Sequence, residues 1–274
     1  MIEQILGQEA ITSKTNSTIV KIGKLVKKKY RDEDKLFLCD GVKLFHEAIN
    51  FGAKIEYILL KNDVDFESDT IDAIKALKAS GTRVLVLNEA VYSKVSTEIS
   101  PQGIIAVCSY LDLIKYEDEL KENINQNEKV MMLEAIRDPG NLGTIIRNAA
   151  AFGIDRLILS SDCVDIYSQK IIRAAMGAIF KLKINIVGDF VGAIKHLQGL
   201  GRVVLSATLN DKALVLGKKA LNKTDVVIIG NEGHGLSSEA INASNDAIII
   251  PMEKNTESLN AAMASAIFMW ELYK

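Results

Sequence analysis

The sequence predicts an α/β protein of two domains. Its 274 residues exceed the ~150 of a typical single domain, and 48% of them are hydrophobic, so each half can bury a core. Short apolar segments alternate with segments of helical periodicity along the chain, which is typical of sheets covered by helices. A polar stretch rich in acidic residues, 113–127, interrupts this alternation. We expect a linker there, between domains at 1–112 and 128–274.

The first domain is expected to be an α/β sandwich. Its predicted strands are 36–39, 55–60, 83–87 and 104–108, and its predicted helices are 41–51, 70–79 and 88–95. In the helix 41–51, four apolar residues have the spacing of a buried stripe: Val42, Phe45, Ala48 and Ile49.

The second domain is expected to hold a parallel sheet. Its predicted strands are 130–133, 154–159, 182–187, 202–208, 225–229 and 247–250, and its predicted helices include 142–152, 188–200 and 259–272. Several of these strands are apolar throughout instead of alternating, as in sheets with helices on both faces. Asn141 suits the N-cap of the first of these helices, and Gly153 suits the left-handed position after its end. Ser168 is expected to cap a further helix that carries Arg173.

The composition excludes several classes of protein. With 33 Lys and Arg against 35 Asp and Glu, the net charge of −2 argues against a chain that wraps a polyanion over its whole surface. The three cysteines lie far apart, so neither a disulfide framework nor a zinc site is expected. No apolar run reaches the ~18 residues that span a bilayer, and the first residues lack a signal-peptide pattern. We expect no metal, no membrane and a reducing cytoplasmic setting.

Residues 21–31 hold six cations and no acid. Ile22, Leu25 and Val26 have the spacing of an inward helix face, which would turn the cations outward. Such a surface is either a solvated helix face or a contact for nucleic-acid phosphates, and the sequence leaves both open. Arg173 is likewise either a nucleic-acid contact or half of a surface ion pair. The candidate contacts in the basic segment are Lys21, Lys24, Lys27, Lys28, Lys29 and Arg31.

A glycine loop in the second half, 230–235 (GNEGHG), carries possible chemistry. It directly follows a predicted strand, where backbone can approach a ligand. Its GxxGxG spacing differs from the GxGxxG of dinucleotide-binding enzymes and it comes late in the chain, which argues against a nucleotide-dependent oxidoreductase. Glu232 is either an exposed loop charge or a site residue, and His234 is expected to be incidental.

Two further segments, 137–147 (RDPGNLGTIIR) and 250–260 (IPMEKNTESLN), lead from strand ends into helices. Arg147 stands among apolar neighbours, where it would bind a carboxylate or a phosphate, or form a structural salt bridge. Ser258 and Asn260 suit a helix N-cap. Because all three segments follow strands of one predicted sheet, we expect them at one edge of that sheet.

The ordered segments RDPGNLGTIIRNAAAFG, IIGNEGHGLSSE and IIIPMEKNTESLNAAMASAI resemble motifs 1, 2 and 3 of the SpoU/TrmH family. These are the S-adenosylmethionine-dependent RNA ribose 2′-O-methyltransferases of the SPOUT superfamily. The resemblance covers 128–274. The first half is similar to the L30e/L7Ae-like substrate-binding domain that often precedes such a domain, through Arg31, 37–41 and 100–106.

The resemblance implies an N-terminal L30e-like domain and a C-terminal α/β knot, in which the chain after about Asn222 threads a loop. The segments near Thr208, 230–235 and 250–260 would then pack together around the methyl donor. By position, the resemblance assigns the binding of S-adenosylmethionine to Thr208, Gly230, Asn231, Gly233, Ile250, Met252 and Leu259.

The resemblance assigns the reaction itself to Asn141, Arg147, Glu232, Ser258 and Asn260. A ribose 2′-hydroxyl is a very weak acid, so the site must help to remove its proton and hold its oxygen in line with the methyl group. Arg147 is often given the role of base in this family. Since Arg keeps its proton in proteins, we expect it to hold a phosphate or a developing oxyanion. Lys254 stands where the family commonly has glycine, which we interpret as loop variation.

Ribosomal RNA is the expected substrate, because the added domain resembles a ribosomal RNA-binding fold. A transfer-RNA 2′-O-methyltransferase and a non-catalytic RNA-binding protein that keeps the knot are the alternatives, and the presence of all five reactive residues favours the enzyme. The helix 259–272 is apolar on nearly every side and needs more cover than one sheet face gives. With 137–147 it is expected to form a twofold homodimer. The resemblance adds that Arg147 serves the partner's site.

Overall fold

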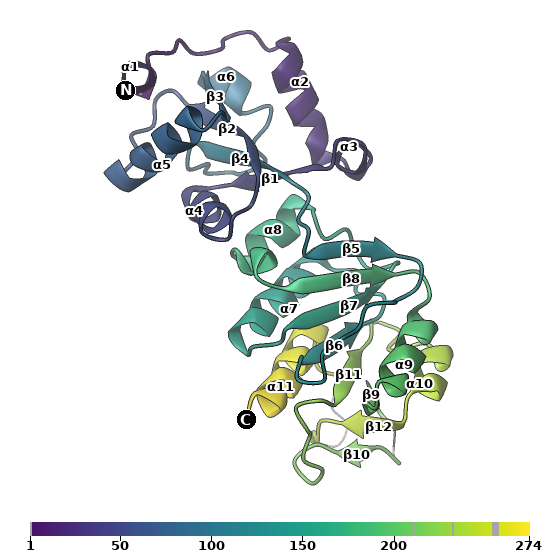
Figure 1. The fold of residues 1–274 in the computed structure, drawn as a ribbon. Coiled ribbons are helices and arrows are strands. Elements are labelled where there is room, and N and C mark those ends of the chain that lie inside the picture. Colours follow the sequence, from purple (N-terminus) through teal and green to yellow (C-terminus); the bar gives the residue numbers. More distant parts are fainter. Residues whose placement is uncertain (1, 211, 232, 254–257) are drawn as a thin grey trace. The chain divides into compact units, whose positions relative to one another are not determined.

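The computed structural model describes residues 2–210, 212–231, 233–253 and 258–274. Its contacts divide the chain into two compact units. The first comprises Met1–Leu111 and Tyr167–Phe180, and the second comprises Asp112–Ile166 and Lys181–Lys274. Each unit is built on one sheet (Figure 1). The predicted α/β class is confirmed for both.

The first unit has a mixed sheet in the order β1-β4-β2-β3, in which β4 runs antiparallel to both neighbours and β2 runs parallel to β3. The strands are β1 (Leu36–Asp40), β2 (Ile55–Lys61), β3 (Arg83–Leu87) and β4 (Ile104–Ser109). The helices are α1 (Ile2–Leu6), α2 (Ser17–Gly23), η1 (Lys24–Val26), α3 (Lys28–Asp34), α4 (Val42–Asn50), α5 (Ser68–Ala79), α6 (Glu89–Tyr92), α8 (Gln169–Ala175) and η2 (Ala178–Phe180). The central strand β4 is buried from Ile104 to Cys108, which explains its unbroken apolar run.

The basic segment is not the single helix that its periodicity predicts. Lys27 has φ −97° and ψ 133°, an extended conformation that ends η1 and begins α3. Ile22 and Leu25 are buried as expected, whereas Val26 is 43% exposed. The break changes which face each later residue presents.

The second unit has an all-parallel sheet of eight strands in the order β10-β12-β9-β11-β6-β7-β8-β5. The strands are β5 (Ile114–Glu117), β6 (Val130–Leu133), β7 (Arg156–Ser160), β8 (Lys183–Val187), β9 (Val204–Ala207), β10 (Leu214–Val215), β11 (Val226–Ile229) and β12 (Asp246–Ile249). Strands β6, β7 and β11 are buried along their whole length. The parallel sheet of the expected class is therefore confirmed.

Helices cover both faces of this sheet (Figure 1): α9 (Phe190–Gly199) and α10 (Ser238–Ala243) on one, α7 (Pro139–Ala151) and α11 (Ala261–Tyr273) on the other. The cap of α7 differs from expectation. Asp138 is its N-cap and accepts a hydrogen bond from the Asn141 N–H at 2.8 Å, so Asn141 lies within the first turn. Gly153 has φ +63°, as its predicted left-handed position requires.

The stretch expected to be a linker, 113–127, contains β5, which extends the second sheet beside β8. Two buried arginines hold the residues that follow it. Arg202 Nη2 donates to the carbonyl oxygens of Asn125, at 2.7 Å, and Glu128, at 2.8 Å. Arg156 binds the carboxylates of Glu122 and Glu128. The carboxylates of this region therefore bind Arg156, whereas Arg202 binds its backbone carbonyls, and the stretch is held on the second unit by both.

Candidate active site

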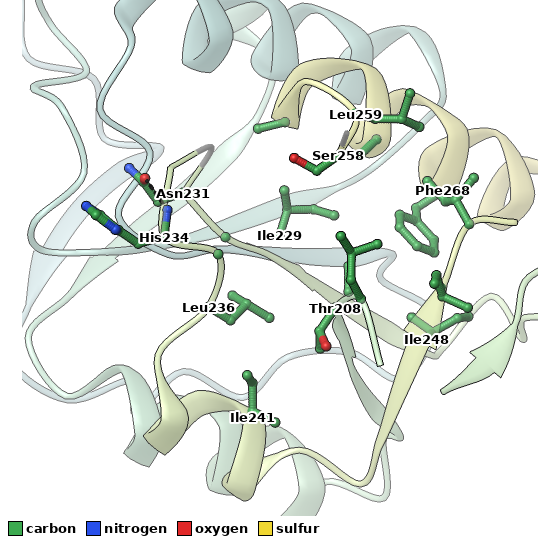
Figure 2. A pocket seen from close by; sticks show the side chains of 18 of the residues that line it. Thr208, Ile229, Asn231, His234, Leu236, Ile241, Ile248, Ser258, Leu259 and Phe268 are labelled. Carbon is green, nitrogen blue, oxygen red and sulfur yellow. Dashed lines mark hydrogen bonds between the residues drawn. The ribbon is translucent and has the colours of Figure 1, made fainter. Parts of the chain in front are cut away.

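A cavity of about 400 Å³ lies at the carboxyl ends of β9, β11 and β12 (Figure 2). Three stretches of chain, which follow these three strands, meet there. Its lining includes all the residues assigned by position to the cofactor: Thr208, Gly230, Asn231, Gly233, Ile250, Met252 and Leu259. Ser258, expected at the reaction itself, also lines it. The expected packing of these segments is present.

The loop 230–235 closes on itself. The Asn231 N–H donates to the Gly235 carbonyl at 3.1 Å, and the Gly235 N–H donates back at 2.9 Å. A Cβ atom on Gly230 would stand 2.5 Å from the carbonyl carbon of Gly235 and 2.6 Å from the backbone nitrogen of Leu236. Glycine is needed at 230 because two runs of backbone touch there.

The Asn231 side chain is used within the protein. Its Nδ2 donates to the carbonyl of Ala135 at 2.8 Å, and its Oδ1 accepts from the N–H groups of Gly233 and His234 at 2.8 and 3.2 Å. Asn231 therefore shapes the loop through its side-chain amide as well as through its backbone bonds to Gly235.

The walls of the cavity are apolar. Ile229 lies at its centre in Figure 2, with Ile248 and Phe268 on one side and Leu236 and Ile241 below. Such walls with backbone groups at strand ends suit a ligand that has a flat apolar ring and a few polar edges.

Motif 3 meets motif 1 beside the cavity. Asn260 is the N-cap of α11, and its Oδ1 accepts from the N–H groups of Ala262 and Met263 at 2.9 and 3.3 Å. Its Nδ2 donates to Oδ1 of Asn141 at 3.0 Å. The cap and the contact between motifs are therefore both made by this residue. Glu232 and Lys254 lie outside the described residues.

Arg147 does not line the cavity of its own chain. It is exposed on α7, and it forms no ion pair with any residue that the structure describes. The salt bridge considered from the sequence is thus not made within the described part of the chain. A free guanidinium on a helix that packs against α11 is available to a ligand or to another subunit.

The basic segment is largely neutralised by acids that directly follow it. Lys21 binds Asp34 at 2.8 Å, Lys28 binds Asp32 at 2.5 Å, and Lys29 lies 3.8 Å from Glu33. Arg31 requires a correction. It is 4% exposed, and its Nη1 donates to the carbonyls of Leu25 and Val26 at 2.7 and 2.8 Å, so it caps η1 inside the protein and is not a surface contact.

Two cations of the basic segment, Lys24 and Lys27, keep exposed side chains without an ion pair among the described residues. Sequence reasoning missed Lys94, an isolated exposed lysine that follows α6. Its carbonyl lies 3.6 Å from where a Cβ on Gly23 would stand, beside Lys24, and its Nζ donates to the Lys14 carbonyl at 3.4 Å. Arg173 forms the alternative ion pair, with Glu98.

Glu134 was also missed. It directly follows β6, and its carboxylate accepts two hydrogen bonds from Ser237, from the N–H at 2.8 Å and from the hydroxyl at 2.5 Å. The sequence offered one indication of it: an acidic residue directly follows an apolar strand, at the edge of the sheet where the three motifs were expected. Among the described residues no group of His, Cys, Asp or Glu could hold a metal ion, and no helix is long and apolar enough to cross a membrane.

Two family models match the chain. The SpoU rRNA methylase family matches residues 128–270, and the MRM3-like substrate binding domain matches residues 16–106. The chain is 29% identical over 262 residues to the 23S rRNA (guanosine(2553)-2′-O)-methyltransferase RlmP of Bacillus subtilis, with 96% of this chain and 98% of that protein covered.

Solved structures agree with the whole chain. The crystal structure of an rRNA methyltransferase from Sinorhizobium meliloti matches with a TM-score of 0.82, at 28% identity over 96% of each chain. The AdoMet-bound rRNA methyltransferase from the same organism matches with a TM-score of 0.78, at 27% identity, over 96% of this chain and 97% of that one. The likeness therefore includes both units.

Proposed function

The chain belongs to the SpoU rRNA methylase family and is an S-adenosylmethionine-dependent RNA 2′-O-methyltransferase, and from this premise we propose that it methylates ribosomal RNA as a homodimer. The observation that carries the proposal is the cavity at the ends of β9, β11 and β12, where motifs 2 and 3 meet. The three free cysteines support the further proposal that the protein works in a reducing, cytoplasmic setting.

The residues present fit the cofactor. A cavity of about 400 Å³ is in the range of small-molecule sites, and its apolar walls match an adenine face. The closed glycine loop 230–235 brings backbone to the cavity edge, as the recognition of a nucleoside requires. S-adenosylmethionine supplies a methyl group activated by a sulfonium.

The protein's own residues then have to orient the ribose and control its proton. We assign the hydrogen bonds that hold the nucleotide to Ser258, which lines the cavity, and to Asn141, which is bound by Asn260. Arg147 supplies a positive charge that binds a phosphate or the developing 2′-oxyanion. Arranging these donors in advance lowers the barrier, because no reorganisation is then needed as charge develops.

Ribosomal RNA is proposed over transfer RNA on two grounds. Residues 16–106 match a substrate-binding domain, and the relative from Bacillus subtilis carries 23S rRNA in its name. Lys24, Lys27 and Lys94 of the first unit are exposed and form no ion pair with a described acid. Exposed cations of this kind support binding to the phosphates of a structured RNA.

The homodimer is proposed from α11. Phe268, Met269 and Leu272 are buried within the unit, whereas the opposite side exposes Met263 (64%) and Trp270 (47%). Large apolar side chains of this kind dominate interface cores. A second copy of the same surface would cover them, as twofold symmetry allows. Arg147, exposed on the adjacent α7, would then serve the cavity of the partner.

Mapping of 2′-O-methyl groups in total RNA from cells with and without this protein tests the proposal. Loss of a methyl group at one position in ribosomal RNA, restored by the wild-type protein and not by an Asn141→Ala variant, is the expected result. Loss at a transfer-RNA position would replace the proposed substrate. An unchanged map together with RNA binding would favour the non-catalytic alternative.

A further inference from the structure

Glu134 holds the far end of the cavity loop. Its Oε2 accepts the Ser237 N–H at 2.8 Å and its Oε1 accepts the Ser237 hydroxyl at 2.5 Å, so both carboxylate oxygens bind one residue. Ser237 in turn is the N-cap of α10, since its Oγ accepts the Ala240 N–H at 3.1 Å. The point where the loop becomes a helix is therefore bound to the end of β6.

The near end of the loop is bound to the same place. The Glu134 N–H donates to the Ile229 carbonyl at 2.9 Å and extends the pairing of β6 with β11 by one residue. The next residue, Ala135, accepts the Asn231 amide at 2.8 Å through its carbonyl. Residues 134–135 thus bind the loop at both of its ends, at Ile229 and Asn231 and at Ser237.

Residues 134–135 also lead to motif 1. The chain continues through the buried Ile136 to Asp138, the N-cap of the helix that carries Asn141 and Arg147. Residues 134–138 therefore connect two parts of the site. One is the wall of the cavity formed by motif 2, and the other is α7, the helix expected to face the nucleotide.

We propose that Glu134 is a positioning residue, whose carboxylate fixes the cavity loop at its end, Ser237, and so keeps the cavity in the shape that binds S-adenosylmethionine. The proposal rests on the cofactor role of this cavity. A glycine-rich loop loses much conformational entropy when it is ordered, and the two bonds to an ionised carboxylate offset that loss more than neutral bonds would. Without them the binding-competent loop is only a fraction of the population, and the apparent affinity falls by that fraction.

The test is calorimetric binding of S-adenosylmethionine and of its demethylated product to the full chain without RNA. Glu134→Ala is expected to weaken binding about tenfold. Glu134→Gln keeps one acceptor oxygen, and Ser237→Ala keeps the N–H, so each should lie between Glu134→Ala and wild type. The double variant Glu134→Ala/Ser237→Ala should lose less affinity than the two single losses combined, because both substitutions remove the same contact and the double variant adds only the loss of the α10 cap. The matched control is Glu239→Gln, an exposed glutamate on α10.

Kinetics separate positioning from general damage. The KM for the cofactor should rise in Glu134→Ala while kcat at saturating cofactor stays within about twofold of wild type, since the loop is then held by the ligand. Wild-type affinity in a folded Glu134→Ala protein, additive losses in the double variant, or an equal loss in Glu239→Gln overturns the proposal. If Glu134→Ala does not fold, Glu134→Gln and Ser237→Ala decide by the same criteria. Failure of the wild-type protein to bind the cofactor would instead overturn the role of the cavity.

Discussion

The side-chain amide of Asn260 donates a hydrogen bond from Nδ2 to Oδ1 of Asn141 over 3.0 Å, and so joins two residues that lie 119 positions apart in the sequence. The same Asn260 caps α11 through its Oδ1. One residue thus starts the last helix and orients the side chain of motif 1. Its two functions use different atoms, so they can be separated by substitution.

Asn260→Ser is expected to lower activity with little effect on stability. Serine keeps an oxygen that can cap α11, but its side chain is too short to reach Asn141. Asn260→Ala removes both interactions and should also lower the free energy of unfolding by about 1 kcal/mol. Methyl transfer under saturating cofactor and chemical denaturation measure the two effects. Equal activity in Asn260→Ser and wild type would show that the hydrogen bond to Asn141 is dispensable.

The hydrogen bond between Asn260 and Asn141 is an example of a contact that the sequence alone does not reveal, whereas much of the fold could be predicted. The strands of the second sheet and the three motifs could be predicted because apolar runs and glycine loops are local signals. The N-cap of α7 could not be predicted: it is Asp138 and not Asn141. Both residue types cap helices, and which of them does so depends on where the helix begins. The burial of Arg31 depends on an extended residue at Lys27 that periodicity does not reveal. The role of Glu134 depends on a partner 103 positions away, which no local pattern reveals.

Salt dependence of RNA binding should distinguish the free lysines from the paired ones. Lys24→Ala/Lys27→Ala is expected to reduce the slope of log K against log salt by about 0.7–0.9 for each RNA phosphate that the variant no longer binds. The matched control is Lys28→Ala/Lys29→Ala, whose ammonium groups already bind Asp32 and Glu33 and should release fewer counterions. Filter binding of a structured RNA over a salt series measures both. A larger change of slope in Lys28→Ala/Lys29→Ala than in Lys24→Ala/Lys27→Ala would show that RNA binds mainly to α3.

The second unit should lose stability at acid pH through Glu122 and Glu128. Burial alone would raise the pKa of each carboxyl, but bonds to Arg156 and to Lys115 or Lys183 outweigh it and lower the pKa below the ordinary value of 4.5. Carboxyls with a pKa lowered by folding stabilise the protein above their unfolded pKa, and this stabilisation disappears as pH falls through the folded pKa.

Unfolding temperatures measured from pH 7 to pH 3 should therefore fall below about pH 4.5, and Glu128→Gln should show a shallower fall from a lower plateau. The control is Glu119→Gln, whose carboxylate pairs with Lys121 on the exposed surface and should contribute little. An identical pH profile for Glu128→Gln and wild type would remove this ion-pair cluster as a source of acid sensitivity.

Complementation between two inactive variants tests the shared site. Arg147→Ala removes the exposed guanidinium, and Gly230→Ala places a Cβ 2.5 Å from the Gly235 backbone and so deforms the cofactor loop. Each homodimer should be inactive. If Arg147 serves the partner's cavity, a heterodimer has one site with both defects and one intact site.

Random pairing of equal amounts makes about half of the dimers heterodimers, so the mixture should recover about a quarter of the wild-type activity. Unfolding and refolding the two variants together, with different affinity tags, allows the heterodimer to be isolated and assayed. The control is Arg147→Ala mixed with the double variant Arg147→Ala/Gly230→Ala, which leaves no intact site and should stay inactive. An isolated heterodimer without activity would place Arg147 at its own subunit's cavity. An active monomer in sedimentation would exclude the dimer, and the exposed Met263 and Trp270 of α11 would then need another partner to cover them.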